Sequence, residues 1–205
     1  MTWTAKTLQV IKAAISRDDP HLSQLVMKML SELPEQAKCA EASMAVMSKT
    51  LVWLEGDPEL ISDIILKLHD HVSNGRVSKA VMLKYIATFL ANCFKPSDQS
   101  RYFSNVIKLL NLITSKCPEA KQMLLEENRT LICDVAKSIG TVDQYRLQLD
   151  ITQLLFRLAP KNLKERRRFA LHEWHLNESF LDISASGFLE ANYYLQRELG
   201  NFCRM

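Results

Sequence analysis

Three observations predict an all-α protein. Glycine and proline are scarce, at five and six of 205 residues, so the loops should be short. Long stretches are rich in Ala, Leu, Met, Lys, Glu and Gln, which favour the helix. No run of β-branched residues alternates with polar residues in the way that a half-buried strand requires. We therefore expect helices along the whole chain.

The first half of the chain divides into six predicted helices. Asp57-Pro58 places a capping residue before a first-turn proline, which starts a helix. Asn74-Gly75 is a turn signal between two others. The expected helices cover about 4–16, 21–31, 34–54, 58–72 and 78–93, and a sixth, capped by Ser97 or Asp98, carries Tyr102 to Ile113.

Six further helices are expected in the second half. Pro118 opens a short helix, Gly140 ends the next, and Pro160 separates the two helices that follow. Apolar residues recur within them at helical spacing. The expected ranges are about 118–126, 129–139, 143–158, 163–174, 178–183 and 188–199.

The helix predicted over 143–158 has a broad apolar face. Asp143 is its expected N-cap. Tyr145, Leu149 and Phe156 widen the face well beyond a single seam, and helices of this kind are usually packed on more than one side. We therefore expect this helix at the centre of a stacked helical array. Its inward positions at helical spacing are Leu147, Ile151, Leu154, Leu155 and Leu158.

Three prolines at a fixed interval indicate a repeat. Pro20, Pro58 and Pro96 are 38 residues apart, and each lies beside a predicted loop. Periods of roughly 40 residues with two or three helices are typical of HEAT and armadillo repeats. The interval fails at Asp134, which falls inside a predicted helix. We predict an irregular α-solenoid of armadillo or HEAT type with about 10–12 helices, in one domain over residues 1–205; a compact helical bundle is the alternative.

Composition argues against several classes of protein. The net charge of +3 is too small to imply nucleic-acid binding by itself. The five cysteines are scattered and odd in number, which predicts buried, reduced thiols in an intracellular compartment instead of a disulfide framework. No stretch approaches the roughly 18 apolar residues of a membrane span, and the N-terminus has no apolar signal core.

Lys161, Lys164, Arg166, Arg167 and Arg168 form the basic cluster of the sequence. These side chains could contact phosphate, an acidic partner or a nuclear import receptor. The alternative is a solvated helix face whose long aliphatic stems cover the core. No aromatic residues interleave with the basic ones as in nucleic-acid motifs, which favours the solvated face. The cluster is still the candidate partner-binding surface of the chain.

We expect no enzymatic activity, no cofactor and no metal site. The sequence has no glycine-rich phosphate loop, nucleophile elbow or Cys-x-x-Cys motif. His172 and His175 could share a helix face, but their spacing differs from that of HExxH and no third ligand is evident. Trp174 could anchor a partner, although closure of the core between adjacent helices is the favoured interpretation.

Residues 144–201 carry a series of features that point to one family. They begin with a Tyr-x-Leu-Gln helix start and an apolar helix ending in Arg157-Leu158, followed by a charged connector. Ala170 through Trp174, a Phe-containing helix and Arg197 through Asn201 complete the series. This segment resembles the N-terminal armadillo-repeat-like domain of the synaptonemal complex protein 2 family, which includes a paralogue, synaptonemal complex protein 2-like. Upstream, AKQMLLEENRTLICDVAKSI looks like the preceding helices of that domain.

The resemblance implies a protein of the meiotic chromosome axis, located on chromosomes in the nucleus. It implies a non-catalytic scaffold of the synaptonemal complex lateral element. Such a scaffold would bind chromosome-axis or centromere-associated proteins through its helical-repeat surface. The family has no catalytic residues to carry over to this chain.

Two other functions remain open from the sequence. The chain could be a generic helical-repeat adaptor outside meiosis, for example in trafficking or cytoskeletal assembly. It could also bind DNA weakly through the basic connector 161–168, in which case its affinity should fall steeply with salt. We expect neither a membrane nor a small-molecule substrate as its partner.

Overall fold

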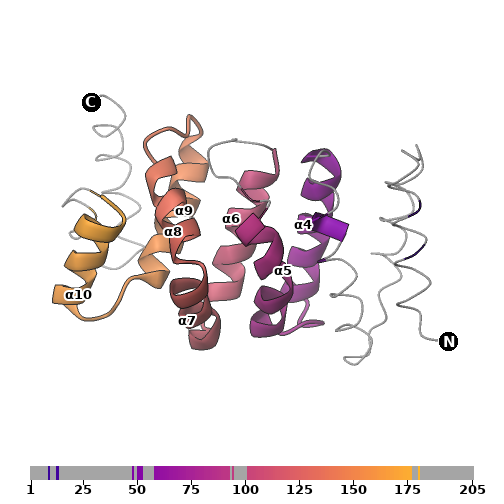
Figure 1. Ribbon diagram of the computed structural model, residues 1–205, viewed down its shortest axis with the longest axis horizontal. Helices are drawn as coiled ribbons and strands as arrows, with labels where there is room; N and C mark the ends of the chain where they lie inside the picture. The colour runs from indigo at the N-terminus through magenta and orange to yellow at the C-terminus, as the bar shows by residue number, and fades with distance from the viewer. Residues whose placement is uncertain are drawn as a thin grey trace. The chain divides into compact units, whose positions relative to one another are not determined.

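The computed structural model describes residues 58–92 and 101–176, together with residues 9, 13, 48, 50–52, 94 and 180. Within these ranges seven α-helices and one short π-helix follow one another and no strand occurs, which confirms the predicted all-α class for this part of the chain (Figure 1). The helices predicted over 4–16, 21–31, 34–54, 178–183 and 188–199 fall largely outside the described residues.

The chain divides into two compact units, Met1–Ile113 and Thr114–Met205. We describe each unit by itself, and the single domain predicted over 1–205 stays a prediction. In the first unit the described helices are α4 (Pro58–Ser73), α5 (Lys79–Asn92) and α6 (Arg101–Thr114). The predicted ranges 58–72 and 78–93 agree with α4 and α5 to within about two residues, the usual uncertainty of helix ends. The predicted caps Asp57, Ser97 and Asp98 lie outside the described residues.

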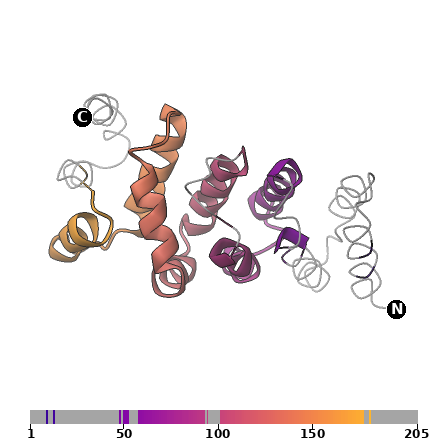
Figure 2. The same ribbon diagram turned by 45° about the horizontal axis from the view of Figure 1, so that its top comes forward.

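Side chains join the three helices of the first unit, which lie side by side (Figure 2). The Asn105 amide of α6 donates a 2.7 Å hydrogen bond to Ser62 Oγ of α4. Phe89 of α5 meets Tyr102 of α6 edge to face, with ring centroids 6.1 Å apart. Phe103 of α6 is fully buried. Apolar packing and the Asn105–Ser62 hydrogen bond therefore join these described helices.

The turn between α4 and α5 has the geometry that its sequence predicts. Gly75 has a φ of 69°, which a residue without a Cβ adopts at little cost. Its N–H donates to Val72 O at 3.1 Å, and the Arg76 N–H donates to His71 O at 2.9 Å. These bonds satisfy the last carbonyl groups of α4.

The second unit contains four α-helices and a π-helix in its described part. They are α7 (Pro118–Glu127), α8 (Arg129–Ser138), α9 (Tyr145–Leu158), α10 (Leu163–Arg168) and the π-helix η2 (Phe169–Glu173). Helix α7 packs against α8 and α9, and α8 also packs against α9 (Figure 1). The apolar positions predicted for α9, Leu147, Ile151, Leu154, Leu155 and Leu158, are all buried.

Two expectations for α9 are wrong. Asp143 is not the N-cap, because the helix starts at Tyr145 and Gln144 occupies the cap position. Tyr145 is 41% exposed, so it does not extend the buried face. Polar residues take part in that face instead, and Gln148, Asp150 and Thr152 are buried. The buried surface of α9 is broad, as predicted, but its composition is partly polar.

The single helix predicted over 163–174 changes its geometry part of the way along. After Arg168 the chain widens into η2, and the Trp174 N–H donates to Phe169 O, five residues back, at 2.9 Å. Trp174 is 2% exposed, with its ring 5.7 Å from that of Phe169 and 6.1 Å from that of Phe180. The predicted role of Trp174 as a core residue is confirmed.

In the described residues, no helix combines the length and the apolar character that crossing a membrane would require.

Candidate functional site

The first turn of α10 is held by a side-chain cap. Asn162 Oδ1 accepts hydrogen bonds from the backbone N–H groups of Lys164 at 2.9 Å and Glu165 at 3.3 Å. Asn at the cap with Glu three residues later resembles the capping box, a signal that could have identified Asn162 from the sequence. The cap fixes the start of the helix that carries most of the basic cluster.

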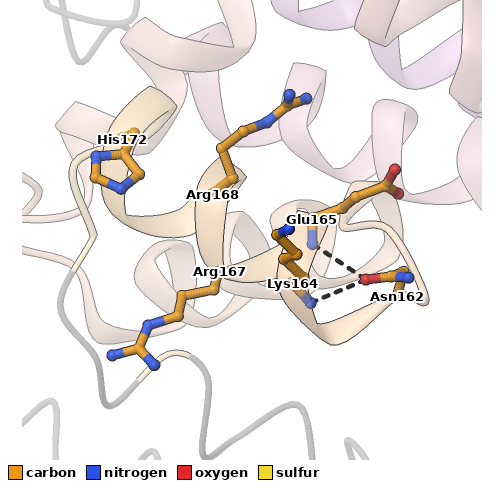
Figure 3. Close-up of a pocket in the computed structure, with 6 residues that line it drawn as sticks. All are labelled: Asn162, Lys164, Glu165, Arg167, Arg168 and His172. Atoms are coloured by element: carbon orange, nitrogen blue, oxygen red, sulfur yellow. Dashed lines mark hydrogen bonds between the residues drawn. The ribbon is translucent and has the colours of Figure 1, made fainter.

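A hollow of about 500 Å³ lies on the surface of α10. Lys164, Arg167, Arg168 and His172 project from α10 and η2 in different directions around it (Figure 3). All four side chains belong to exposed residues. The described residues that line the hollow are Asn162, Lys164, Glu165, Arg167, Arg168 and His172.

The charge of this lining is mainly positive. Lys164, Arg167 and Arg168 carry one positive charge each, and Glu165 carries the one negative charge among the described lining residues. The formal charge of that set is therefore about +2 when His172 is neutral. A surface of this kind attracts an anionic group, and the attraction weakens as salt is added.

Two residues of the predicted basic cluster do not line the hollow. Arg166 is half-buried, donates from Nε to Pro160 O at 2.8 Å and lies 5.8 Å above the Phe156 ring. It therefore fastens the connection between α9 and α10. Lys161 is exposed on that connection. The predicted cluster thus separates into three residues at the hollow, namely Lys164, Arg167 and Arg168, and two beside it.

A carboxylate that does not line the hollow, that of Glu173, lies near arginines from two helices. Glu173 Oε1 lies 3.0 Å from Arg129 Nη2 at the start of α8 and 3.8 Å from Arg168 Nε. The Glu173 side chain is only 11% exposed. Its other oxygen, Oε2, is buried and accepts no hydrogen bond from the residues that the structure describes. Sequence reasoning missed both Arg129 and Glu173, because nothing local indicates that α8 and η2 meet.

The same carboxylate affects a nearby cysteine. Burial raises the pKa of the Cys133 thiol, and the negative charge of Glu173 raises it further, while Arg129 and Lys137 lower it. Cys133 and Cys117 are free thiols and are half-buried, not fully buried as expected. The cysteines at 39, 93 and 203 lie outside the described residues.

Replacing Glu173 with glutamine should make Cys133 more reactive. Loss of the negative charge lowers the thiol pKa, so more thiolate is present at pH 8 and alkylation by iodoacetamide should accelerate a few-fold. Arg129→Gln should act in the opposite direction, because this arginine lowers the same pKa. Mass spectrometry of the peptide containing Cys133 gives both rates. Equal rates in the two variants would contradict this electrostatic coupling, and the exposed Glu127→Gln is the control.

In the part of the chain that the structure describes, no three or more His, Cys, Asp or Glu side chains gather as possible metal ligands. His172 lies at the rim of the hollow, whereas His175 follows η2 with a φ of 54°. These two histidines, which could have shared a helix face, therefore do not lie on one regular helix.

No family model, curated protein or solved structure matches this chain.

Proposed function

We propose that this chain is a non-catalytic protein-interaction scaffold that binds an acidic segment of a partner protein. The observation that supports it is the hollow on α10, which three exposed cationic side chains surround. We further propose that the helices of the whole chain form an irregular α-solenoid of armadillo or HEAT type. Such arrays typically offer extended surfaces for protein partners.

Binding at the hollow would depend on several ion pairs together. Each exposed pair contributes only about 0.2–1 kcal/mol, so one contact would not hold a partner. Lys164, Arg167 and Arg168 can act jointly because the Asn162 cap and the Arg166 contacts fix the start of α10. Contacts elsewhere on the helical surface would add to this affinity.

The cellular role that we propose rests on the resemblance of residues 144–201 to the synaptonemal complex protein 2 family. On that basis the scaffold acts in the nucleus, at the meiotic chromosome axis, within the lateral element of the synaptonemal complex. Its partners would then be chromosome-axis or centromere-associated proteins. The basic hollow suits such partners where they carry acidic segments.

Affinity capture from nuclear extracts of meiotic cells tests this proposal. The charge-reversed double variant Lys164→Glu/Arg167→Glu should lose partners that the wild-type chain retains, because each partner carboxylate would then meet like charge. Lys84→Glu/Lys108→Glu makes the same change in charge at exposed positions in the first unit and should capture as the wild type does. Unchanged capture by the first variant would remove the hollow from the mechanism. Recovery of trafficking or cytoskeletal proteins alone would favour a generic adaptor outside meiosis.

Weak DNA binding is a second candidate function, supported by the exposure of Lys161, Lys164 and Arg167 along the connector 161–168. Fluorescence anisotropy with a short labelled duplex would test it across a salt titration. Phosphate contacts should make the logarithm of the binding constant fall linearly with the logarithm of salt concentration. Absence of binding at low salt would refute DNA binding without affecting the protein-partner proposal.

A further inference from the structure

Arg168 is only loosely engaged with Glu173. Its Nε lies 3.8 Å from Glu173 Oε1, which is longer than a hydrogen bond, and its guanidinium lies 5.4 Å from the Phe169 ring centroid. In Figure 3 the Arg168 side chain extends away from those of Lys164 and Arg167. The residue therefore lines the hollow while its charged end lies near a carboxylate that does not line it.

Arg129 allows Arg168 to leave that carboxylate. A buried carboxylate that loses its sole partner is strongly destabilised, because its charge is then uncompensated in a poorly hydrated site. Glu173 keeps Arg129 Nη2 at 3.0 Å, so its charge stays compensated when Arg168 turns away. Arg129 is thus a positioning residue, because it contacts Glu173 and is not among the residues that line the hollow.

Once turned outward, Arg168 would complete a row of donors. Lys164, Arg168 and His172 follow one another at intervals of four residues, and all three line the hollow. Arg168 occupies the middle of this row. Its planar guanidinium can hold two oxygens of one anionic group through two parallel N–H bonds, a fixed geometry that an ammonium group lacks.

The charge of the hollow fits a doubly charged ligand. The described lining has a formal charge of about +2, and a phosphorylated side chain carries about −1.5 to −2 at neutral pH with three acceptor oxygens. A single carboxylate carries only about half the negative charge of a phosphorylated side chain. The negative charge of Glu165, which also lines the hollow, would repel a continuous polyanion such as a nucleic-acid backbone.

We propose that the hollow binds a phosphorylated serine or threonine of the partner segment, and that Arg168 exchanges Glu173 for the phosphate. This inference rests on the proposed function, since it names the chemical class of the segment that the scaffold binds. Phosphorylation of the partner would then control its capture.

Inorganic phosphate and a matched set of peptides test the inference on the full chain. Inorganic phosphate should shift the Arg168 Nε–Hε signal in NMR spectra in a saturable way, while acetate at equal ionic strength should not.

A peptide with one phosphoserine should bind at least roughly tenfold more tightly than the same peptide with Glu or Ser at that position. The Arg168→Gln variant should lose most of this preference for the phosphoserine peptide, whereas the Arg168→Lys variant should keep part of it. Glu173→Gln should tighten phosphopeptide binding a few-fold, because Arg168 no longer has a competing carboxylate.

The outcomes separate this inference from the proposed function. Equal affinity for the phosphoserine and Glu peptides would overturn the phosphate preference while leaving a general acidic site intact. Partner capture that depends on Lys164 and Arg167 but is unaffected by phosphatase treatment would likewise overturn the phosphate preference and leave a general acidic site intact. No saturable response to phosphate, or a Glu173→Gln variant with unaltered affinity, would overturn the exchange. Circular dichroism of each variant confirms that it is folded, and Lys108→Gln controls for a change in net charge.

Discussion

Replacing Trp174 with alanine is expected to lower the free energy of unfolding of the second unit by about 3–5 kcal/mol. The indole is 2% exposed and packs edge to face against Phe169 and Phe180. Ala170, in the same π-helix, is fully buried, which indicates a close-packed site. Truncation would leave a cavity that the surrounding side chains could fill only in part. Urea denaturation followed by far-ultraviolet circular dichroism measures the loss.

Trp174→Phe is the matched control for this prediction. It keeps a ring between Phe169 and Phe180, so we expect it to recover more than half of the loss. A Trp174→Ala variant within about 1 kcal/mol of the wild type would contradict the assignment of Trp174 to the core. It would instead favour the alternative that the sequence left open, in which this tryptophan anchors a partner.

Helix starts were predictable where they depend on local chemistry. Helices α4 and α7 begin at Pro58 and Pro118, as expected, because proline fixes φ and lacks the N–H that a first turn leaves unpaired. The Asn74-Gly75 turn is likewise local. The start of α9 was predicted wrongly at Asp143, since a capping residue type is common in loops and does not by itself select the cap position.

Burial was less predictable than helix position, because it depends on which neighbours a helix meets. Tyr145 and Gln148 illustrate this in α9. The aromatic residue is 41% exposed and the amide is 4% exposed, the reverse of what their polarity suggests. A polar side chain can be buried where a backbone carbonyl lies within reach, and one sequence does not show that arrangement.

The candidate site was predictable as a segment but not in its detail. The cluster 161–168 was visible as a charge run, yet Arg166 bonds to Pro160 O, so its role differs from that of Arg167. Glu173 pairs with Arg129, which comes from α8, a separate helix earlier in the chain. Tertiary packing brings these groups together, and neither composition nor helical periodicity records such long-range pairing. Arg168 lies farther from the same Glu173 oxygen, at 3.8 Å.

Replacing Gln148 with leucine is expected to lower the free energy of unfolding by about 2 kcal/mol, although the new residue is apolar and similar in size. The Gln148 amide donates to Val142 O at 2.7 Å and to Ile139 O at 3.4 Å, in the connection between α8 and α9. Leucine offers no donor, so these carbonyl groups would stay buried without that partner. Urea denaturation gives the size of the effect.

Gln144→Leu is the control, because Gln144 is exposed at the cap of α9 and makes no side-chain cap bond. It should change the stability by no more than about 0.5 kcal/mol. Hydrogen exchange adds a local test: Gln148→Leu should speed exchange at the amides of Thr141 and Val142, which donate to Ser138 O at 3.0 Å each. If Gln148→Leu were as stable as the wild type, the amide would not be holding this connection. The buried Asp150 and Thr152 would then be the remaining polar residues to test on this face of α9.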